Sequence, residues 1–389
     1  MTLPSHLARI VESEYPRFSD AEMSRRRTAV EALITQADCD HLIFCGANRF
    51  GSVVQWLTQW PVTAEAVGVL TPGKRDALFV QYVNHAPQAR LLADKADVAW
   101  GGEMSIAEAI TILEQRRARQ NRVATIGPMS AEQHAALAVK YGKLRNLNHD
   151  YIRLRQVKSE EELDWFRIGA HFSDLGMAAL RDGLKPGLSE RELGDLVERA
   201  YVSHGGTNVI HYIGVTSMNA PDLGVPRQFP RMRPVQAGDI VTAEISAAFW
   251  EYPGQVLRTF ALGAPNRLFQ ELHAAADAAF DAITAELKAG ATPSQVIEAS
   301  GVIEDAGFTI IDDLLHGYGG GYLPPILGCK SRPAGPVPQE PFRAGQTVVI
   351  QPNVVTRDGK AGVQTGEMVL VTDMGIERLH SIPRGFVQL

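Results

Sequence analysis

The sequence predicts an α+β protein of two domains, in which a smaller α/β domain precedes a domain built on an antiparallel sheet flanked by helices. Its 389 residues, 45% of them hydrophobic, exceed the roughly 250–300 residues at which a single hydrophobic core stops growing. Short apolar runs alternate with helical patterns early in the chain, and capped helices with longer strand patterns follow after about residue 155. We therefore predict domains at 1–155 and 156–389.

The N-terminal domain is predicted from four apolar runs and the amphipathic stretches between them. The runs 40–46, 66–73, 76–82 and 122–127 are short and rich in Val, Leu, Ile and Phe, which is typical of strands. The stretch 19–36 has the spacing of an amphipathic helix. Alternating strands and helices predict an α/β domain.

Start signals predict the helices of the second domain. Ser159 with Glu162, and Ser189 with Glu192, form the pattern of a capping box, and Pro293 suits the first position of a further helix. The predicted helices are 159–180, a segment from 189, 267–289 and a segment from 293.

Apolar runs between and after these helices predict the strands of the second domain. They are 208–215, 239–250, 255–263, 346–355 and 367–373. An antiparallel sheet with helices packed on it is the simplest arrangement of these elements. The Pro- and Gly-rich stretch 322–341 is predicted to be a long loop, and loops of that length are often functional.

Composition argues against several classes of protein. The formal net charge is -6, and basic and acidic residues are interspersed, so no basic stripe for nucleic acid is expected. Three cysteines without CxxC spacing favour neither a disulfide framework nor a zinc site. No apolar stretch approaches ~18 residues, and the start lacks an export pattern. We expect a soluble cytoplasmic protein with a small-molecule substrate and no membrane or nucleic-acid partner.

Four segments in order resemble the catalytic domain of the pita-bread family, which includes creatinase, prolidase and methionine aminopeptidase. They are IRLRQVKSEEELDWFRIGA, AGDIVTAEISAAFWEYPGQVLRTFALG, LHGYGGGYLPP and QPNVVTRDGKAGVQTGEMVLVTDMG. The segment ANRFGSVVQWLT is weakly similar to the creatinase-type N-terminal domain. The resemblance implies a C-terminal pita-bread domain, a creatinase-type N-terminal domain and a homodimer.

The chain departs from this family at the metal site. Metal-dependent relatives use two Asp, one His and two Glu to hold two divalent ions, because such cations need several anionic oxygens and an imidazole. The corresponding positions here are Glu244, Gln255, His316, Gln351 and Gly366. Only one carboxylate remains, so neither a metal nor another cofactor is expected. Glu367 follows Gly366, but alternation along a strand would turn its side chain to the other face.

The spacing of Glu244, Tyr252 and Arg258 and the loop YLPPILG resemble the metal-free branch that contains ectoine hydrolase, with creatinase as another metal-free relative. That resemblance implies a metal-independent hydrolase of a C–N bond in a small non-peptide substrate, such as an amidine, cyclic amide or guanidino compound. Glu244 would serve as nucleophile or base, His316 would carry protons, and Glu367 is a third catalytic candidate. Substrate contacts are expected from Gln255, Gln351, His211, Tyr318, Tyr322 and Arg49.

Other interpretations stay open at this point. The same scaffold could eliminate as a lyase, act as a Xaa-Pro-type metallopeptidase with an altered site, or bind a partner without catalysis. Glu244 could instead form a structural ion pair with Arg258, and His211 could be a core histidine. Cys329 has no base nearby in sequence, which favours packing over catalysis. The run GYGGGY precedes prolines instead of a helix, which argues against a nucleotide loop.

Overall fold

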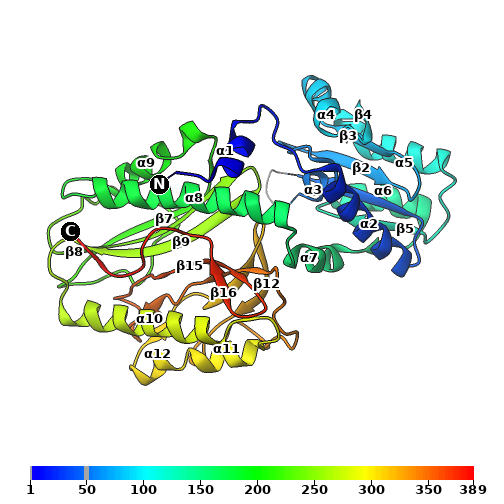
Figure 1. The fold of residues 1–389 in the computed structure, drawn as a ribbon. Helices are drawn as coiled ribbons and strands as arrows, with labels where there is room; N and C mark the ends of the chain where they lie inside the picture. The colour runs from blue at the N-terminus through cyan, green and yellow to red at the C-terminus, as the bar shows by residue number, and fades with distance from the viewer. Residues whose placement is uncertain (1, 48–51) are drawn as a thin grey trace. The chain divides into compact units, whose positions relative to one another are not determined.

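The computed structural model describes residues 2–47 and 52–389. The chain divides into two compact units, shown in Figure 1. The N-terminal unit is Glu12–Arg155, and the C-terminal unit is Gln156–Leu389 together with the described residues before Glu12. The predicted continuous N-terminal domain therefore differs from the structure at its start, where helix α1 belongs with the later part of the chain.

The N-terminal unit is a mixed sheet with helices, as its alternating pattern predicts. The strand order is β4-β3-β2-β1-β5-β6, antiparallel from β1 to β3 and parallel elsewhere. Its strands are β1 (His41–Gly46), β2 (Ala66–Leu70), β3 (Asp76–Val80), β4 (Ala96–Trp100), β5 (Val123–Ile126) and β6 (Arg145–Asn146). Its helices are α2 (Asp20–Gln36), α3 (Val53–Thr58), η1 (Val83–His85), α4 (Ala86–Leu92), η2 (Gly102–Met104), α5 (Ser105–Gln115) and α6 (Ala131–Tyr141), and α7 (Asn148–Gln156) leads out of the unit.

The C-terminal unit is built on a large sheet with the strand order β12-β11-β13-β15-β9-β8-β7. In Figure 1 these strands lie between α8 and α9 on one side and α10 to α12 on the other. The strands are β7 (Thr207–Ser217), β8 (Asp239–Phe249), β9 (Tyr252–Ala261), β11 (Leu315–Tyr318), β12 (Tyr322–Leu327), β13 (Thr347–Ile350) and β15 (Gly366–Val371). Outside this order, β16 (Ile376–Arg378) pairs with β15, β17 (Val387–Gln388) pairs with β9, and β10 (Thr309–Ile310) pairs separately with β14 (Val354–Val355). The helices are α1 (Ser5–Glu12), α8 (Glu160–Gly183), α9 (Glu190–Arg199), η3 (Val202–His204), α10 (Arg267–Glu286), α11 (Pro293–Ala299) and α12 (Val302–Asp305).

Local signals in the sequence explain where these helices begin. The Ser159 side chain accepts from the backbone of Glu162, whose own side chain accepts from the backbone of Ser159. This reciprocal capping box satisfies two amides at the start of α8. Gly254 explains how close α8 lies to the hairpin of β8 and β9, because a Cβ there would come within 2.2 Å of Ala170 Cα.

One predicted loop is partly a strand. Residues 322–327 of the predicted loop 322–341 form β12, which pairs with β11 at the edge of the large sheet. Its residues alternate between exposed and buried, as an edge strand with one covered face requires. Two prolines in this segment hid the strand pattern, and Pro is tolerated here because β12 is an edge strand. The glycines after Tyr318 form the turn of the hairpin, with positive φ at Gly320 and Gly321.

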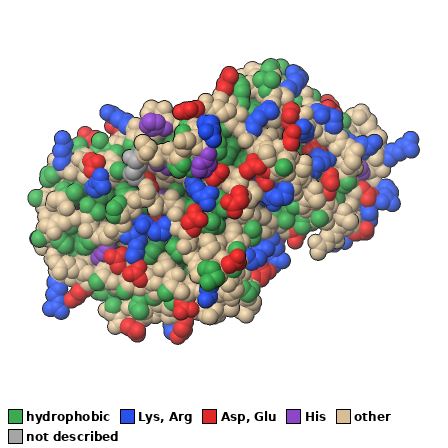
Figure 2. Space-filling model, in the orientation of Figure 1, with side chains coloured by type: hydrophobic (Ala, Val, Ile, Leu, Met, Phe, Trp, Pro, Cys, Tyr) green, Lys and Arg blue, Asp and Glu red, His purple; other side chains and the backbone are tan. Residues whose placement is uncertain are grey.

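The charged residues show no segregation on the visible face of the molecule. Figure 2 shows Lys and Arg interspersed with Asp and Glu over that face. Among the described helices, none is both long and apolar enough to cross a membrane.

Candidate functional site

A cluster of buried polar side chains lies on one face of the large sheet. Glu244 on β8 is 5% exposed and Gln255 on β9 is fully buried. Their neighbour Ile245 faces α8, where it lies near Gly176, so Glu244 points to the opposite face by alternation along the strand. Gln255 shares the face of Glu244, because its cross-strand partner is Ser246, two residues along β8.

Hydrogen bonds join these side chains into a chain of amides and carboxyls. Gln255 Nε2 donates to Glu244 Oε1 at 2.9 Å and to Gln351 Oε1 at 3.0 Å. Gln351 Nε2 in turn lies 3.3 Å from Asp313 Oδ1. Gln364 Nε2 approaches the other oxygen of Glu244, Oε2, at 3.3 Å. Glu244 is therefore held by two neutral amides, and no cation among the described residues is paired with it.

The electrostatic setting of Glu244 favours its protonated form more than water would. Burial raises the pKa of Glu244 to about 7, the charge of Asp312 adds to this rise, and the hydrogen bond from Gln364 opposes it. Glu244 can therefore exchange a proton near neutral pH, which is the property of a general base or acid.

A second carboxyl of the cluster, Asp313, is also perturbed. Burial raises its pKa to about 8, and its hydrogen bond with Asp312 and the charges of Asp312 and Glu244 act in the same direction. Asp313 thus carries a proton at neutral pH, while Asp312 beside it is exposed.

His316 lies on β11 and is fully buried. Its ring stacks on Tyr322 with centroids 3.8 Å apart and meets Tyr318 edge-on at 5.4 Å. Burial lowers the pKa of His316 to about 4, against the opposing effects of the Gly317 carbonyl, Asp312 and Gln351. The imidazole is therefore neutral at pH 7, so it acts as a hydrogen-bonding group and not as a charged acid.

The structure brings Glu244, Gln255, Gln351, His316, Tyr318 and Tyr322 to one region of the sheet. It places Glu367 elsewhere, because Glu367 pairs in register with Val256 and so faces away from Gln255. Glu367 accepts from Arg258 Nη2 at 2.8 Å and also from Arg378, which makes it part of a buried ion-pair network. Arg258 is thus the partner of Glu367 and not of Glu244.

One further candidate does not join the cluster. His211 on β7 lies opposite Ile245, which gives it the face away from Glu244, and its Nε2 contacts the Tyr201 hydroxyl at 2.7 Å. Arg49 lies outside the described residues.

Sequence reasoning missed Gln364, Asp312 and Asp313. A usable signal existed for Gln364, which stands two residues before Gly366 and so shares its face in an extended segment. The two aspartates directly precede the strand that carries His316, and adjacent carboxyls before a buried strand were a second signal. Cys329, by contrast, is buried with a raised pKa caused chiefly by burial, which agrees with a packing role.

A comparison with known proteins identifies the family to which the chain belongs. The sequence pattern of metallopeptidase family M24 matches residues 164–373, more than half of the chain. The chain belongs to family M24. A probable dipeptidase PepE of Mycobacterium tuberculosis is 27% identical over 274 residues, covering 67% of this chain and 68% of that protein.

Solved structures of two dipeptidases are similar in fold to nearly the whole chain. The Xaa-Pro dipeptidase of Bacillus anthracis has a TM-score of 0.81 at 17% identity, covering 94% of this chain and all of that one. The dipeptidase PepE of Mycobacterium ulcerans has a TM-score of 0.78 at 22% identity, covering 96% of this chain and all of that one. The predicted α+β class is confirmed, with a pita-bread domain that follows an N-terminal domain in the sequence.

The comparisons correct the expected reaction. The relatives and structural neighbours are named dipeptidases, peptidases and Xaa-Pro enzymes, so the predicted hydrolysis of a non-peptide C–N bond is wrong. The alternative of a Xaa-Pro-type metallopeptidase with an altered site agrees better. The prediction of a hydrolase is supported, but membership of a metal-free, creatinase-like branch is not.

The residues of this chain do not fit the paired metal ions implied by the M24 name. No group of three His, Cys, Asp or Glu side chains in the described part of the chain is arranged to hold a metal ion. Neutral amides at Gln255 and Gln351 supply no charge to offset the desolvation of a dication. Gly366 supplies no side chain, and a Cβ there would lie 2.2 Å from the Ile350 carbonyl oxygen, so a carboxylate at this position would require the backbone to move.

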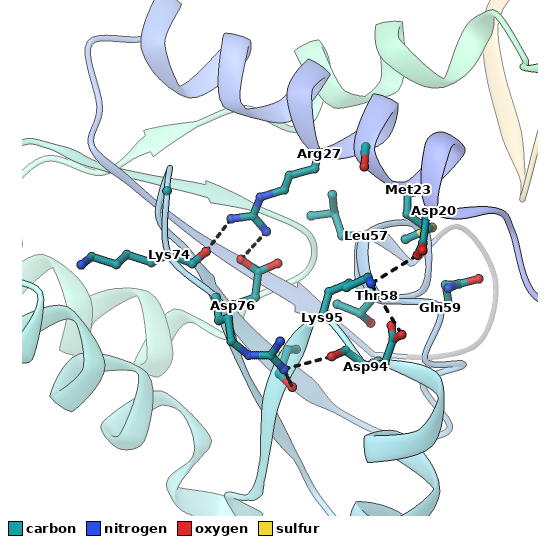
Figure 3. Close-up of a pocket in the computed structure, with 15 residues that line it drawn as sticks. Asp20, Met23, Arg27, Leu57, Thr58, Gln59, Lys74, Asp76, Asp94 and Lys95 are labelled. Carbon is teal, nitrogen blue, oxygen red and sulfur yellow. Dashed lines mark hydrogen bonds and ion pairs between the residues drawn. The ribbon is translucent and has the colours of Figure 1, made fainter.

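A cavity of about 450 Å³ opens separately in the N-terminal unit. Figure 3 shows charged side chains of both signs converging on it, with Arg27 bound to Asp76 and Lys95 close to Asp20 and Asp94. These charges largely neutralise one another. Burial raises the pKa of Asp76 in this cavity, but Arg27 pairs with it, whereas Glu244 is held only by amides among the described residues. The cluster on the large sheet is therefore the candidate active site.

Proposed function

We propose that this M24 protein hydrolyses the peptide bond of a short, dipeptide-sized substrate at the Glu244 cluster, without a paired metal centre. Dipeptidases among its relatives support the reaction class. The observation that carries the assignment to these residues is Glu244 itself. It is a buried carboxyl with a pKa of about 7, fixed at both oxygens by amide groups that leave its charge uncompensated.

In the proposed reaction, ionised Glu244 takes one proton from a water molecule whose oxygen attacks the carbonyl carbon. The same carboxyl then returns that proton to the leaving nitrogen as the C–N bond breaks, so an acid and an amine form without net proton transfer. A base of this pKa is well matched to neutral pH. Gln255 and Gln364 hold the two carboxyl oxygens in place, which lowers the reorganisation needed during the step.

The aromatic residues supply the remaining polar contacts. Burial raises the pKa of Tyr318 above its usual range, so its hydroxyl keeps a proton at neutral pH and can donate to the developing oxygen anion. Neutral His316, stacked on Tyr322, limits water near the reacting bond and offers one more hydrogen-bonding nitrogen. Each role belongs to a side chain of this protein.

The first test is hydrolysis of a dipeptide panel by the purified protein and by Glu244→Gln, followed as amine release. We expect kcat/KM of Glu244→Gln to fall by at least about 100-fold, because general-base catalysis contributes on that scale. Glu271→Gln, an exposed change on α10, is the matched control and should retain full activity. Full activity in Glu244→Gln would disprove the assignment.

A second measurement tests metal independence. Elemental analysis and activity after dialysis against a chelator should show substoichiometric metal and unchanged turnover, because the donor set does not fit a pair of dications. Loss of turnover that Mn²⁺ or Zn²⁺ restores would leave peptide hydrolysis standing and overturn the metal-free mechanism.

A further inference from the structure

The side-chain amides of Gln255, Gln351 and Gln364 around Glu244 can each be oriented in only one way. Ionised Glu244 can only accept hydrogen bonds, which fixes the NH₂ groups of Gln255 and Gln364 toward it. At the other end, the backbone carbonyl of Asp313 can only accept, and Gln351 Nε2 lies 3.4 Å from it. Both ends therefore fix which atom of each amide is oxygen and which is nitrogen.

With the amides oriented in this way, two of their oxygen atoms accept no hydrogen bond from the part of the chain that the structure describes. Gln255 Oε1 and Gln364 Oε1 are buried and have no hydrogen-bond partner among the described residues. Both belong to amides that contact Glu244, so both oxygens lie beside its carboxyl. A buried carbonyl oxygen without a donor is costly, and native proteins rarely leave one so.

Gln364 is held firmly enough to present such an oxygen. Its backbone N–H donates to Thr259 Oγ1 at 2.8 Å, and Thr259 Oγ1 donates back to the Gln364 carbonyl at 2.8 Å. The side chain is 1% exposed. A reciprocal pair of this kind fixes the backbone of Gln364, and burial restricts the rotation of its side chain.

We propose that Gln255 Oε1 and Gln364 Oε1 accept the N–H of the scissile amide, so that the site selects secondary peptide bonds over N-substituted ones such as Xaa-Pro. This rests on the proposed function, because Glu244 acts on the scissile bond and its neighbours therefore meet that bond's nitrogen. A substrate without this N–H leaves both oxygens unpaired in a buried site, and sites built to bind an N–H reject analogues that lack it. The chain would thus differ in substrate class from the Xaa-Pro dipeptidase whose fold it shares.

The experiment compares two dipeptides that differ only in the substituent on the scissile nitrogen. Ala-Gly carries the scissile N–H, and Ala-sarcosine replaces it by N–CH₃. We expect kcat/KM for Ala-Gly to exceed that for Ala-sarcosine by about 10- to 100-fold, the loss typical of a buried acceptor left unpaired. Ala-Pro should be rejected similarly.

A variant of Gln364 distinguishes a loss of selectivity between the two peptides from a general loss of activity. Gln364→Met keeps the length of the side chain and removes its hydrogen bonding. Turnover of both peptides falls, because Gln364 also holds Glu244, but the ratio between Ala-Gly and Ala-sarcosine should drop at least fivefold. A purely structural role would lower both rates and leave the ratio unchanged. Gln270→Met on α10 is the matched exposed control and should change neither rate nor ratio.

The outcomes distinguish the two proposals. Equal rates for the two peptides, a preference for Ala-sarcosine, or a ratio that Gln364→Met does not change would overturn the selectivity while peptide hydrolysis stands. If neither peptide is cleaved, the proposed function fails, and thermal shift measurements with the same two uncleaved peptides decide the acceptor role. Greater stabilisation by Ala-Gly that disappears in Gln364→Met supports it, and equal stabilisation overturns it.

Discussion

Two buried glutamates on opposite faces of one sheet differ in what surrounds them. Glu367 on β15 is fully buried and bound by Arg258 and Arg378. Burial acts to raise its pKa, but the hydrogen bonds and charges of its partners outweigh burial and lower it. Glu244 on β8 is also buried, yet within the described part of the chain only amides donate hydrogen bonds to its carboxyl, and burial raises its pKa to about 7. Burial alone therefore does not mark a functional carboxyl; burial without a compensating cation does.

The largest effect on stability is expected from removing the charge of Glu367, the glutamate that is paired with arginines. Glu367→Gln leaves Arg258, which is 1% exposed, without its carboxylate partner. We expect the free energy of unfolding to fall by about 3–5 kcal/mol, the usual effect of removing one partner of a buried ion pair. Urea denaturation at pH 7 measures it, with Glu271→Gln as an exposed control that should lie within about 0.5 kcal/mol of the parent. A change below about 1 kcal/mol would show that Glu367 is not the anchor of this network.

The unpaired glutamate should respond to pH in the opposite sense. The folded-state pKa of Glu244, about 7, lies above its ordinary value of 4.5, so its contribution to stability is fully present below pH 4.5 and is lost as pH rises through 7. A shift of this size corresponds to about 3 kcal/mol. Compared with Glu244→Gln, the parent should lose about that much between pH 4.5 and 8. A constant difference across this range would mean that Glu244 is not perturbed.

Local sequence signals predicted most of the fold. The capping boxes at Ser159 and Ser189 depend on residues three positions apart, and both helices begin there in the structure. The alternation rule predicted that Glu367 would face away from the position of Gly366, and the register of β15 against β9 shows the same. Strand β12 was missed, because its prolines suppress the pattern on which strand prediction relies.

The candidate site was harder to predict, because its parts are distant in sequence. Gln364 reaches Glu244 across 120 positions, and Asp313 reaches Gln351 across 38. No local pattern encodes such contacts; they follow from strand order. The perturbation of Asp313 depends on burial and on Asp312 together, which a sequence alone does not give. The resemblance located Glu244, Gln255, His316 and Gln351 but suggested the wrong reaction, because a family position specifies a place and not the chemistry done there.

The smallest predicted effect on stability concerns Gly366, which stands where metal-dependent relatives have a carboxylate ligand. Gly366 has φ of +155°, and an added Cβ would lie 2.2 Å from the Ile350 carbonyl oxygen and 2.9 Å from Gln351 Cα. Gly366→Ala should therefore lower the free energy of unfolding by about 1–3 kcal/mol, since the backbone of β13 must move to admit the methyl group. Gly375→Ala, where nothing lies within 4 Å, is the matched control. If Gly366→Ala is as stable as its control, β13 and β15 can separate at this point. The backbone around position 366 would then have room for a side chain, and lack of space would not explain why this position carries no carboxylate.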